Sequence, residues 1–159
     1  MLDNFKKDLE KGKAAEEIVY RVFSSLDDTH DFKMVGDNPM FYYSGDILAI
    51  DKNTGKEIFI EVKNDSRIAD TNNVLCEEEV YYKKHDYYGR GNMDSDCNIY
   101  AVVSEEQRKI YVINFKVLKS NYRRGEYKVI EWPQQTTFCY LLNINDLKSY
   151  GGLINVVNY

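Results

Sequence analysis

Two short apolar runs joined by turn-forming residues constrain the fold of this chain more than any other feature. The runs span residues 47–50 and 58–62, and β-branched or other apolar side chains dominate both. Between them stand Asp, Asn and Gly residues, which favour tight turns. The pattern predicts an antiparallel β-hairpin that closes near residues 52–56.

Three charged residues interrupt this hairpin at its open end. Strand side chains alternate between two faces, so Glu61 and Lys63 share one face, while Ile58, Ile60 and Val62 point the other way, into a core. The predicted register brings Asp46, at the start of the first strand, close to this end of the second strand. Two carboxylates and one ammonium group are therefore expected to converge.

Such a cluster suits a divalent metal ion that acts on a phosphate. Asp46 and Glu61 offer the hard carboxylate oxygens that Mg²⁺ prefers, and the backbone carbonyl of Val62 adds another oxygen. A bound metal lowers the pKa of a water ligand and neutralises phosphate charge, and Lys63 is placed to orient that water. The alternative is a solvated strand face with a weak Glu–Lys ion pair.

A long amphipathic helix is predicted over residues 3–26. Apolar residues recur at helical spacing from position 15 onward. Glu16 borders that apolar face and can look toward the sheet, whereas Glu17 stands four residues before Arg21 and is expected to be solvated or ion-paired. We therefore select Glu16 as the acid that the helix contributes to the cluster, and keep Glu17 as the alternative.

The rest of the chain predicts further strands and two short helices. Strand-like segments are residues 71–84, 98–103, 109–115, 126–132 and 138–144, and helix-like segments are residues 116–124 and 145–150, the second opening on a candidate Asn-Asp cap. Residues 83–96 carry few apolar side chains and two glycines, and they are predicted to form a loop. The predicted fold is α/β (α+β), one domain over residues 1–159 in which the N-terminal helix packs on a mixed sheet.

Composition excludes several classes of protein. The chain has 159 residues and a formal net charge of −5, which argues against coating nucleic acid by bulk charge but leaves room for a local basic groove. The three cysteines are far apart and form no CxxC pair, so the sequence predicts neither a zinc site nor a disulfide framework, and it predicts a cytoplasmic location. The charged N-terminal segment predicts no signal peptide and no membrane span.

Together the motifs resemble those of the PD-(D/E)xK nuclease superfamily, which includes restriction endonucleases, lambda-type exonucleases and archaeal Holliday-junction resolvases. In this chain KGKAAEE resembles the helix motif with Glu16, GDI supplies Asp46, and EVK supplies Glu61 and Lys63. In that superfamily the helix acid precedes a strand that carries the Asp, and the next strand carries the (D/E)-x-K motif. The order of the motifs along this chain is the same.

The likeness covers residues 11–77 and departs from the superfamily pattern at two positions. Gly45 stands before Asp46, where proline is usual. The segment TNNVLCEEE resembles a T-G-N-x-x-x-E stretch of some members, with Asn72 in place of the glycine, and it assigns Glu77 a supporting role.

The resemblance implies a restriction endonuclease-like core and Mg²⁺-dependent hydrolysis of DNA phosphodiester bonds, with Mn²⁺ as a second possible metal. Glu16, Asp46 and Glu61 would gather the metal in an endonuclease, and a homodimer follows by analogy because cutting two strands needs two sites. One alternative is a catalytically silent nuclease-fold protein that binds nucleic acid or a protein partner. Another is an ordinary α+β domain with a solvated acidic patch.

Four basic residues are candidates for contacts with nucleic acid. Arg67 follows the EVK motif in a polar run, and Lys83, Lys84 and Arg90 are interleaved with aromatic residues and glycines. Basic and aromatic side chains together suit contacts to the backbone and to bases. The alternative is an ordinary charged loop.

Overall fold

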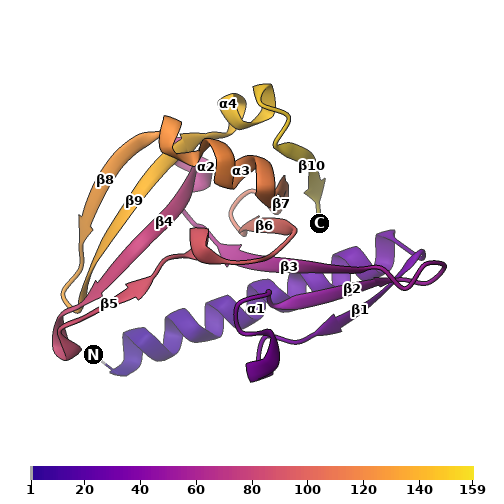
Figure 1. The fold of residues 1–159 in the computed structure, drawn as a ribbon, viewed down its shortest axis with the longest axis horizontal. Helices are drawn as coiled ribbons and strands as arrows, with labels where there is room; N and C mark the ends of the chain where they lie inside the picture. The colour runs from indigo at the N-terminus through magenta and orange to yellow at the C-terminus, as the bar shows by residue number, and fades with distance from the viewer. Residues whose placement is uncertain (1) are drawn as a thin grey trace.

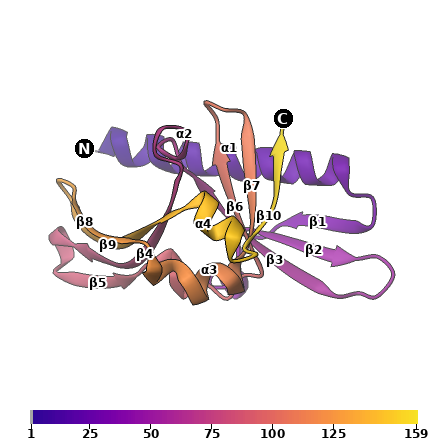
Figure 2. The same cartoon turned by 90° about the horizontal axis from the view of Figure 1, so that it is seen from above.

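The structure is a computed structural model that describes residues 2–159, and it consists of two β-sheets, one long helix and several short ones (Figure 1). The long helix, α1 (Leu2–Leu26), follows the predicted helix closely. It lies across one face of the larger sheet (Figure 2). There the buried Ala15 and Val19 belong to one core cluster with Ile60. Within residues 2–159, no helix has the length and apolar character that crossing a membrane requires.

The larger sheet has six strands in the order β1-β2-β3-β6-β7-β10. These strands are β1 (His30–Met34), β2 (Ile47–Asp51), β3 (Glu57–Asn64), β6 (Ile99–Ser104), β7 (Lys109–Asn114) and β10 (Leu153–Asn158). The predicted hairpin is confirmed as β2 and β3, which pair antiparallel from Ile47 opposite Ile60 to Ile50 opposite Glu57. The sheet is mixed, as predicted, because β3 and β6 run parallel while the other neighbours run antiparallel.

The chain builds half of a second sheet, β4 (Asn73–Tyr82) and β5 (Tyr87–Arg90), on its way from β3 to the parallel strand β6, because parallel neighbours need a long crossover, and it adds β8 (Glu126–Glu131) and β9 (Gln135–Asn143) after β7. This second sheet is antiparallel, in the order β5-β4-β9-β8. One core cluster joins the two sheets, since Val74 of β4 and Leu142 of β9 pack with Val102 of β6 and Ile113 of β7. The smaller sheet is thereby fixed beside the open end of the hairpin (Figure 1).

Short helices connect the strands. They are η1 (Pro39–Phe41), α2 (Ile68–Thr71), η2 (Lys83–His85), η3 (Asn92–Asp94), α3 (Phe115–Asn121), η4 (Tyr122–Arg124) and α4 (Ile144–Ser149). The cap predicted for α4 is wrong by two residues: Asn143 caps it, by accepting a hydrogen bond from the Asn145 N–H at 2.9 Å. The cysteines Cys76, Cys97 and Cys139 are buried as free thiols.

The prediction that residues 83–96 form a loop is wrong, because this segment contains β5 and two helical turns. The exposed edge of β4 provides a partner for β5, and Gly91 lets the backbones meet where any side chain would collide with the Glu77 carbonyl. The sequence pattern also missed the edge strands β1 and β10. In β1 only His30 and Phe32 are half-buried, and Asp31, Lys33 and Met34 are exposed, so its apolar signal is short.

Candidate active site

The site forms where β3 runs past the end of β2. The ladder between the two strands stops at Ile60, whose carbonyl accepts a hydrogen bond from the Asp46 N–H at 2.8 Å. Gly45, one residue earlier, has a φ of +149°, and a Cβ there would lie 2.8 Å from the same carbonyl oxygen. Proline, whose ring fixes φ near about −65°, cannot adopt this conformation. The backbone before Asp46 therefore suits glycine and excludes proline.

Asp46 lies just before the first residue of β2, and its carboxylate, instead of a backbone carbonyl, continues the hydrogen bonding to β3 beyond the end of the ladder. Its Oδ2 atom accepts a hydrogen bond from the Val62 N–H at 2.8 Å. The N–H and C=O of one strand residue point to the same edge of the strand, so the Val62 carbonyl also faces this side. The hairpin thus presents a carboxylate and a backbone carbonyl side by side, as its register predicted for Asp46.

Helix α1 brings Glu16 to the same place. If Gly36 had a Cβ, that atom would lie 3.2 Å from Asp46 Oδ1 and 3.5 Å from Glu16 Oε2, so the two carboxylates border one small space that glycine leaves open. Glu17, the alternative acid, is exposed and does not line the cleft. The structure therefore places Glu16, rather than its neighbour, beside Asp46.

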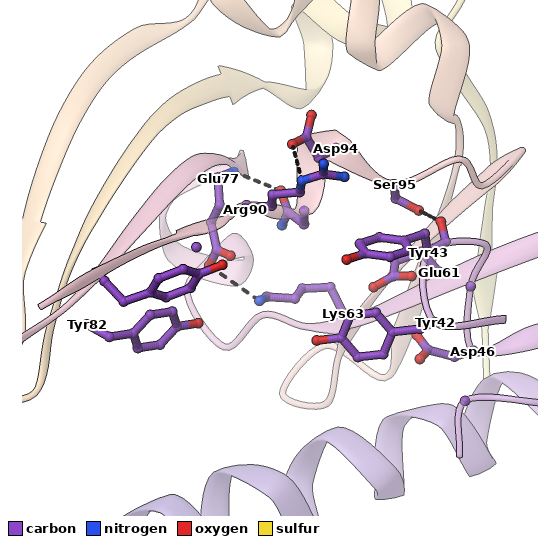
Figure 3. Close-up of a pocket in the computed structure, with 16 residues that line it drawn as sticks. Tyr42, Tyr43, Asp46, Glu61, Lys63, Glu77, Tyr82, Arg90, Asp94 and Ser95 are labelled. Atoms are coloured by element: carbon purple, nitrogen blue, oxygen red, sulfur yellow. Dashed lines mark hydrogen bonds and ion pairs between the residues drawn. The ribbon is translucent and has the colours of Figure 1, made fainter. Parts of the chain in front are cut away.

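Two clefts meet at Asp46, Glu61 and Lys63. One has a volume of about 440 Å³ and opens toward α1, with Glu16 and Val62 in its lining. The other has a volume of about 460 Å³ and opens toward the smaller sheet (Figure 3). Both volumes lie in the range typical of small-molecule and cofactor sites. The hairpin end is consequently accessible from both faces of the sheet.

Lys63 reaches into the second cleft and meets an acid that comes from β4. Its Nζ atom lies 3.4 Å from Glu77 Oε1, and the Glu77 side chain is 18% exposed (Figure 3). Asn92 holds this part of β4 in position, because its Oδ1 accepts from the Glu77 N–H at 2.8 Å while its Nδ2 donates to the Tyr100 hydroxyl at 2.7 Å. The Lys63 ammonium is thereby directed across the cleft.

The carboxylates of the site have raised pKa values, because they are buried close together. Burial, followed by the charge of Asp46, raises the pKa of Glu61 from 4.5 to about 8, although Lys63 opposes the rise. Burial and then Asp46 raise the pKa of Glu16 to about 7. Burial also raises the pKa of Asp46, against the lowering effects of the Val62 N–H and of Lys63. Placing these carboxylates close together in a buried site costs free energy, and a bound cation would offset that cost.

The donor set fits a hard divalent cation. Carboxylates from Glu16, Asp46 and Glu61 and a carbonyl from Val62 are oxygen ligands of the kind that Mg²⁺ takes. Among the described residues, no three acidic, histidine or cysteine side chains already surround one point as metal ligands. Binding would therefore require the glutamate side chains to rotate toward Asp46, which their length allows.

Of the four predicted nucleic-acid contacts, the structure brings Arg90 into the cleft. The Arg90 guanidinium lies 5.3 Å from the centre of the Tyr43 ring, and its Nε atom lies 3.7 Å from Asp94 Oδ2. Its position on β5, opposite Glu79 of β4, sets it at the cleft mouth (Figure 3).

The other three basic residues lie outside the lining of both clefts. Lys83 has a structural partner, since its Nζ donates to Glu131 Oε2 at 2.8 Å and to the Trp132 carbonyl at 2.9 Å. Lys84 is exposed at the tip of the β4–β5 hairpin. Arg67 lies 5.5 Å from the centre of the Trp132 ring. Their predicted role in binding nucleic acid stays a prediction.

Sequence reasoning missed the tyrosines that line the second cleft. Tyr42 and Tyr43 come just before the Gly-Asp pair, while Tyr82 and Tyr87 belong to the β4–β5 hairpin. The adjacent tyrosines in FYYSGD were the signal that could have marked the first pair. For the second pair, the signal was the mixture of aromatic and basic residues around Lys83 and Arg90, but its place in the cleft depends on the pairing of β5 with β4.

The comparisons with known proteins add one distant structural likeness. No family model matches the chain, and no curated protein matches its sequence. Among solved structures, the bacterial homing endonuclease I-Ssp6803I is similar in fold, with 16% sequence identity, a TM-score of 0.48, and coverage of 80% of this chain and 74% of that one. Because this likeness concerns the fold alone, function has to be argued from the site.

Proposed function

We propose that the chain is a metal-dependent deoxyribonuclease of the PD-(D/E)xK type that hydrolyses phosphodiester bonds as an endonuclease. The observation that carries this proposal is the convergence of three acids and a lysine where β3 extends beyond the end of β2. Asp46 is tied to Val62 at 2.8 Å, Glu16 borders the same space as Asp46, and Lys63 crosses the adjoining cleft. Structural needs alone do not explain this convergence, because burial raises the pKa of each acid and the charge of Asp46 raises the pKa of Glu16 and Glu61 further.

Each side chain has a defined part in the proposed reaction. Asp46, Glu61 and the Val62 carbonyl would hold the metal, and Glu16 would approach it from α1. When bound, Mg²⁺ would supply Lewis-acid stabilisation of phosphate charge and acidify a water molecule. The Lys63 ammonium, steered by Glu77, donates hydrogen bonds to the attacking water or to the phosphate oxygen on which charge develops.

The metal, the DNA substrate and the pairing of two chains are parts of the same proposal. Mg²⁺ is the proposed cofactor, and Mn²⁺, which also accepts carboxylate oxygens, should replace it. Cleavage of both strands at one place would call for two chains, which size-exclusion chromatography with light scattering would detect as a homodimer in the presence of DNA.

A cleavage assay with matched variants tests the proposal. Plasmid, single-stranded and branched DNA are incubated with the protein in Mg²⁺, Mn²⁺ or EDTA. Asp46→Asn, which keeps an oxygen acceptor for the Val62 N–H, and Lys63→Ala should each lower the cleavage rate by about 100-fold or more. Glu16→Gln should also lower it, whereas its exposed neighbour Glu17→Gln should not.

Two outcomes would reject the nuclease assignment. Cleavage that persists in EDTA, or in both Asp46→Asn and Lys63→Ala, would place the chemistry elsewhere. An intact protein that cleaves none of the three substrates but still binds DNA would favour the silent nuclease-fold alternative. Circular dichroism of each variant distinguishes these results from loss of folding.

A further inference from the structure

Four exposed tyrosines line the cleft that opens from the catalytic residues toward the smaller sheet. The exposed fractions are 74% for Tyr42, 53% for Tyr43, 39% for Tyr82 and 60% for Tyr87. Large aromatic side chains gathered around one cleft mark a surface that contacts a ligand, since single exposed apolar residues are common but clusters are not. The fold itself gains little from rings that remain this exposed.

The tyrosines form two pairs on opposite sides of Lys63. Tyr42 and Tyr43 meet edge to face at 5.1 Å between ring centres, in the loop that leads to Asp46. Tyr82 and Tyr87 lie nearly parallel, at 15°, with ring centres 6.5 Å apart on the β4–β5 hairpin. Figure 3 shows the Lys63 side chain extending between Tyr82 and the Tyr42–Tyr43 pair. A strand that passes Lys63 would therefore meet aromatic rings before and after it.

Charge alone would hold a nucleic acid poorly in this cleft. Its lining contains the acids Asp46, Glu61, Glu77 and Asp94. The basic residues of the same lining are Lys63 and Arg90, and both already have an acidic partner, at 3.4 Å and 3.7 Å. A polyanion that enters must gain affinity from contacts other than ion pairs, and the tyrosine rings are the groups available for such contacts.

We propose that these tyrosines stack on unpaired bases next to the cleavage site, so that the substrate is single-stranded DNA or duplex DNA carrying a flap or overhang. The inference rests on the proposed nuclease function, because that function explains why a nucleic acid enters the cleft. Stacking requires unpaired bases, since in an intact duplex the faces of each base are covered by its neighbours. A protein partner would also use exposed tyrosines, but the residues proposed to cleave a phosphodiester bond, Asp46, Glu61 and Lys63, line the same cleft.

Binding measured without cleavage tests this inference. Fluorescence anisotropy is recorded in EDTA and in Ca²⁺ with a labelled thymidine oligonucleotide, the same oligonucleotide with abasic sites, and a blunt duplex. The thymidine strand should bind about tenfold or more tightly than either of the other two. Because only two basic residues line the cleft, the slope of log affinity against log salt should be shallow, about −1.4.

Matched variants assign the effect to the cleft. Tyr42→Ala and Tyr87→Ala should each weaken binding of the thymidine strand by about tenfold while leaving the abasic strand unchanged. Tyr42→Phe and Tyr87→Phe keep the ring and should bind as the unmodified protein does. Tyr127→Ala removes a 51% exposed tyrosine of β8 that does not line the cleft, and it should have no effect.

The outcomes separate this inference from the nuclease proposal. Equal binding of the thymidine and abasic strands, tighter binding of the blunt duplex, or no binding of any probe would overturn the stacking inference. Cleavage of blunt duplex that is insensitive to Tyr42→Ala and Tyr87→Ala would overturn it while the nuclease function stands. Base-dependent binding without cleavage in Mg²⁺ or Mn²⁺ would support stacking while the nuclease function fails.

Discussion

Replacing Glu61 by Gln should change how stability depends on pH in the metal-free protein. Glu61 has a pKa raised from 4.5 to about 8, mainly by burial. A carboxyl group whose pKa is higher in the folded state stabilises the fold while it is protonated, and this contribution is lost as pH rises from 4.5 through 8. The free energy of unfolding should therefore fall across this window, and Glu61→Gln should remove much of the fall.

The magnitude follows from the size of the shift. Each pKa unit corresponds to about 1.4 kcal/mol, so full retention of the shift would cost about 5 kcal/mol at pH 9. Water that enters the cleft and rotation of the side chain relieve part of this cost, so we expect Glu61→Gln to be more stable than the unmodified protein by about 2 kcal/mol at pH 9. At pH 4.5 and below the two proteins should differ little.

Urea unfolding in EDTA from pH 4.5 to pH 9, followed by circular dichroism, measures this difference. Glu57→Gln is the matched control, because Glu57 lies on the same strand but is exposed. Adding Mg²⁺ at pH 8 should stabilise the unmodified protein, by about 2.7 kcal/mol at one hundred times its dissociation constant, and Glu61→Gln much less. The reasoning is refuted if Glu61→Gln and the unmodified protein lose stability in parallel as pH rises.

Three further substitutions give predictions with defined signs. Lys63→Ala removes an ion pair with Glu77 at 3.4 Å in which Lys63 is 37% exposed, so urea unfolding should show a loss of about 1 kcal/mol or less while cleavage nearly disappears. Gly45→Ala should lower the free energy of unfolding by about 2 kcal/mol or more, and with it the melting temperature, because its Cβ would lie 2.8 Å from the Ile60 carbonyl oxygen. An unchanged melting temperature would contradict the strained geometry. Gly12→Ala, on a helix with no atom within 4 Å of the new Cβ, should instead raise stability by about 1 kcal/mol in urea unfolding, and any loss would contradict an open helix face there.

The features that could be predicted from the sequence depend on residues close together in the chain. Helical spacing placed α1, and alternation with a central turn placed the hairpin and the side of β3 that Glu61 and Lys63 occupy. The closeness of Asp46 to that end followed from the register alone. These elements also carry the candidate site, which is why its acids and lysine were identifiable before the fold was known.

The features that could not be predicted depend on contacts between distant segments. β5 forms because the edge of β4 is free, although its own sequence, with two tyrosines, a glycine and an arginine, has little apolar alternation. The ion pair of Lys83 with Glu131, 48 residues later, likewise had no signal in the sequence. The tyrosine pairs around the cleft are about 40 residues apart in the chain, and only the tertiary fold brings them to one place.

The central claim is that Glu16, Asp46 and Glu61 hold one divalent cation, and titration with Mn²⁺ followed by electron paramagnetic resonance tests it most directly. The account predicts one bound Mn²⁺ per chain at pH 8, competed by Mg²⁺. Asp46→Asn and Glu61→Gln should abolish this binding, Glu16→Gln should weaken it, and the exposed-site control Glu57→Gln should retain it. Unchanged Mn²⁺ binding in Asp46→Asn, or no binding by the unmodified protein, would contradict the claim.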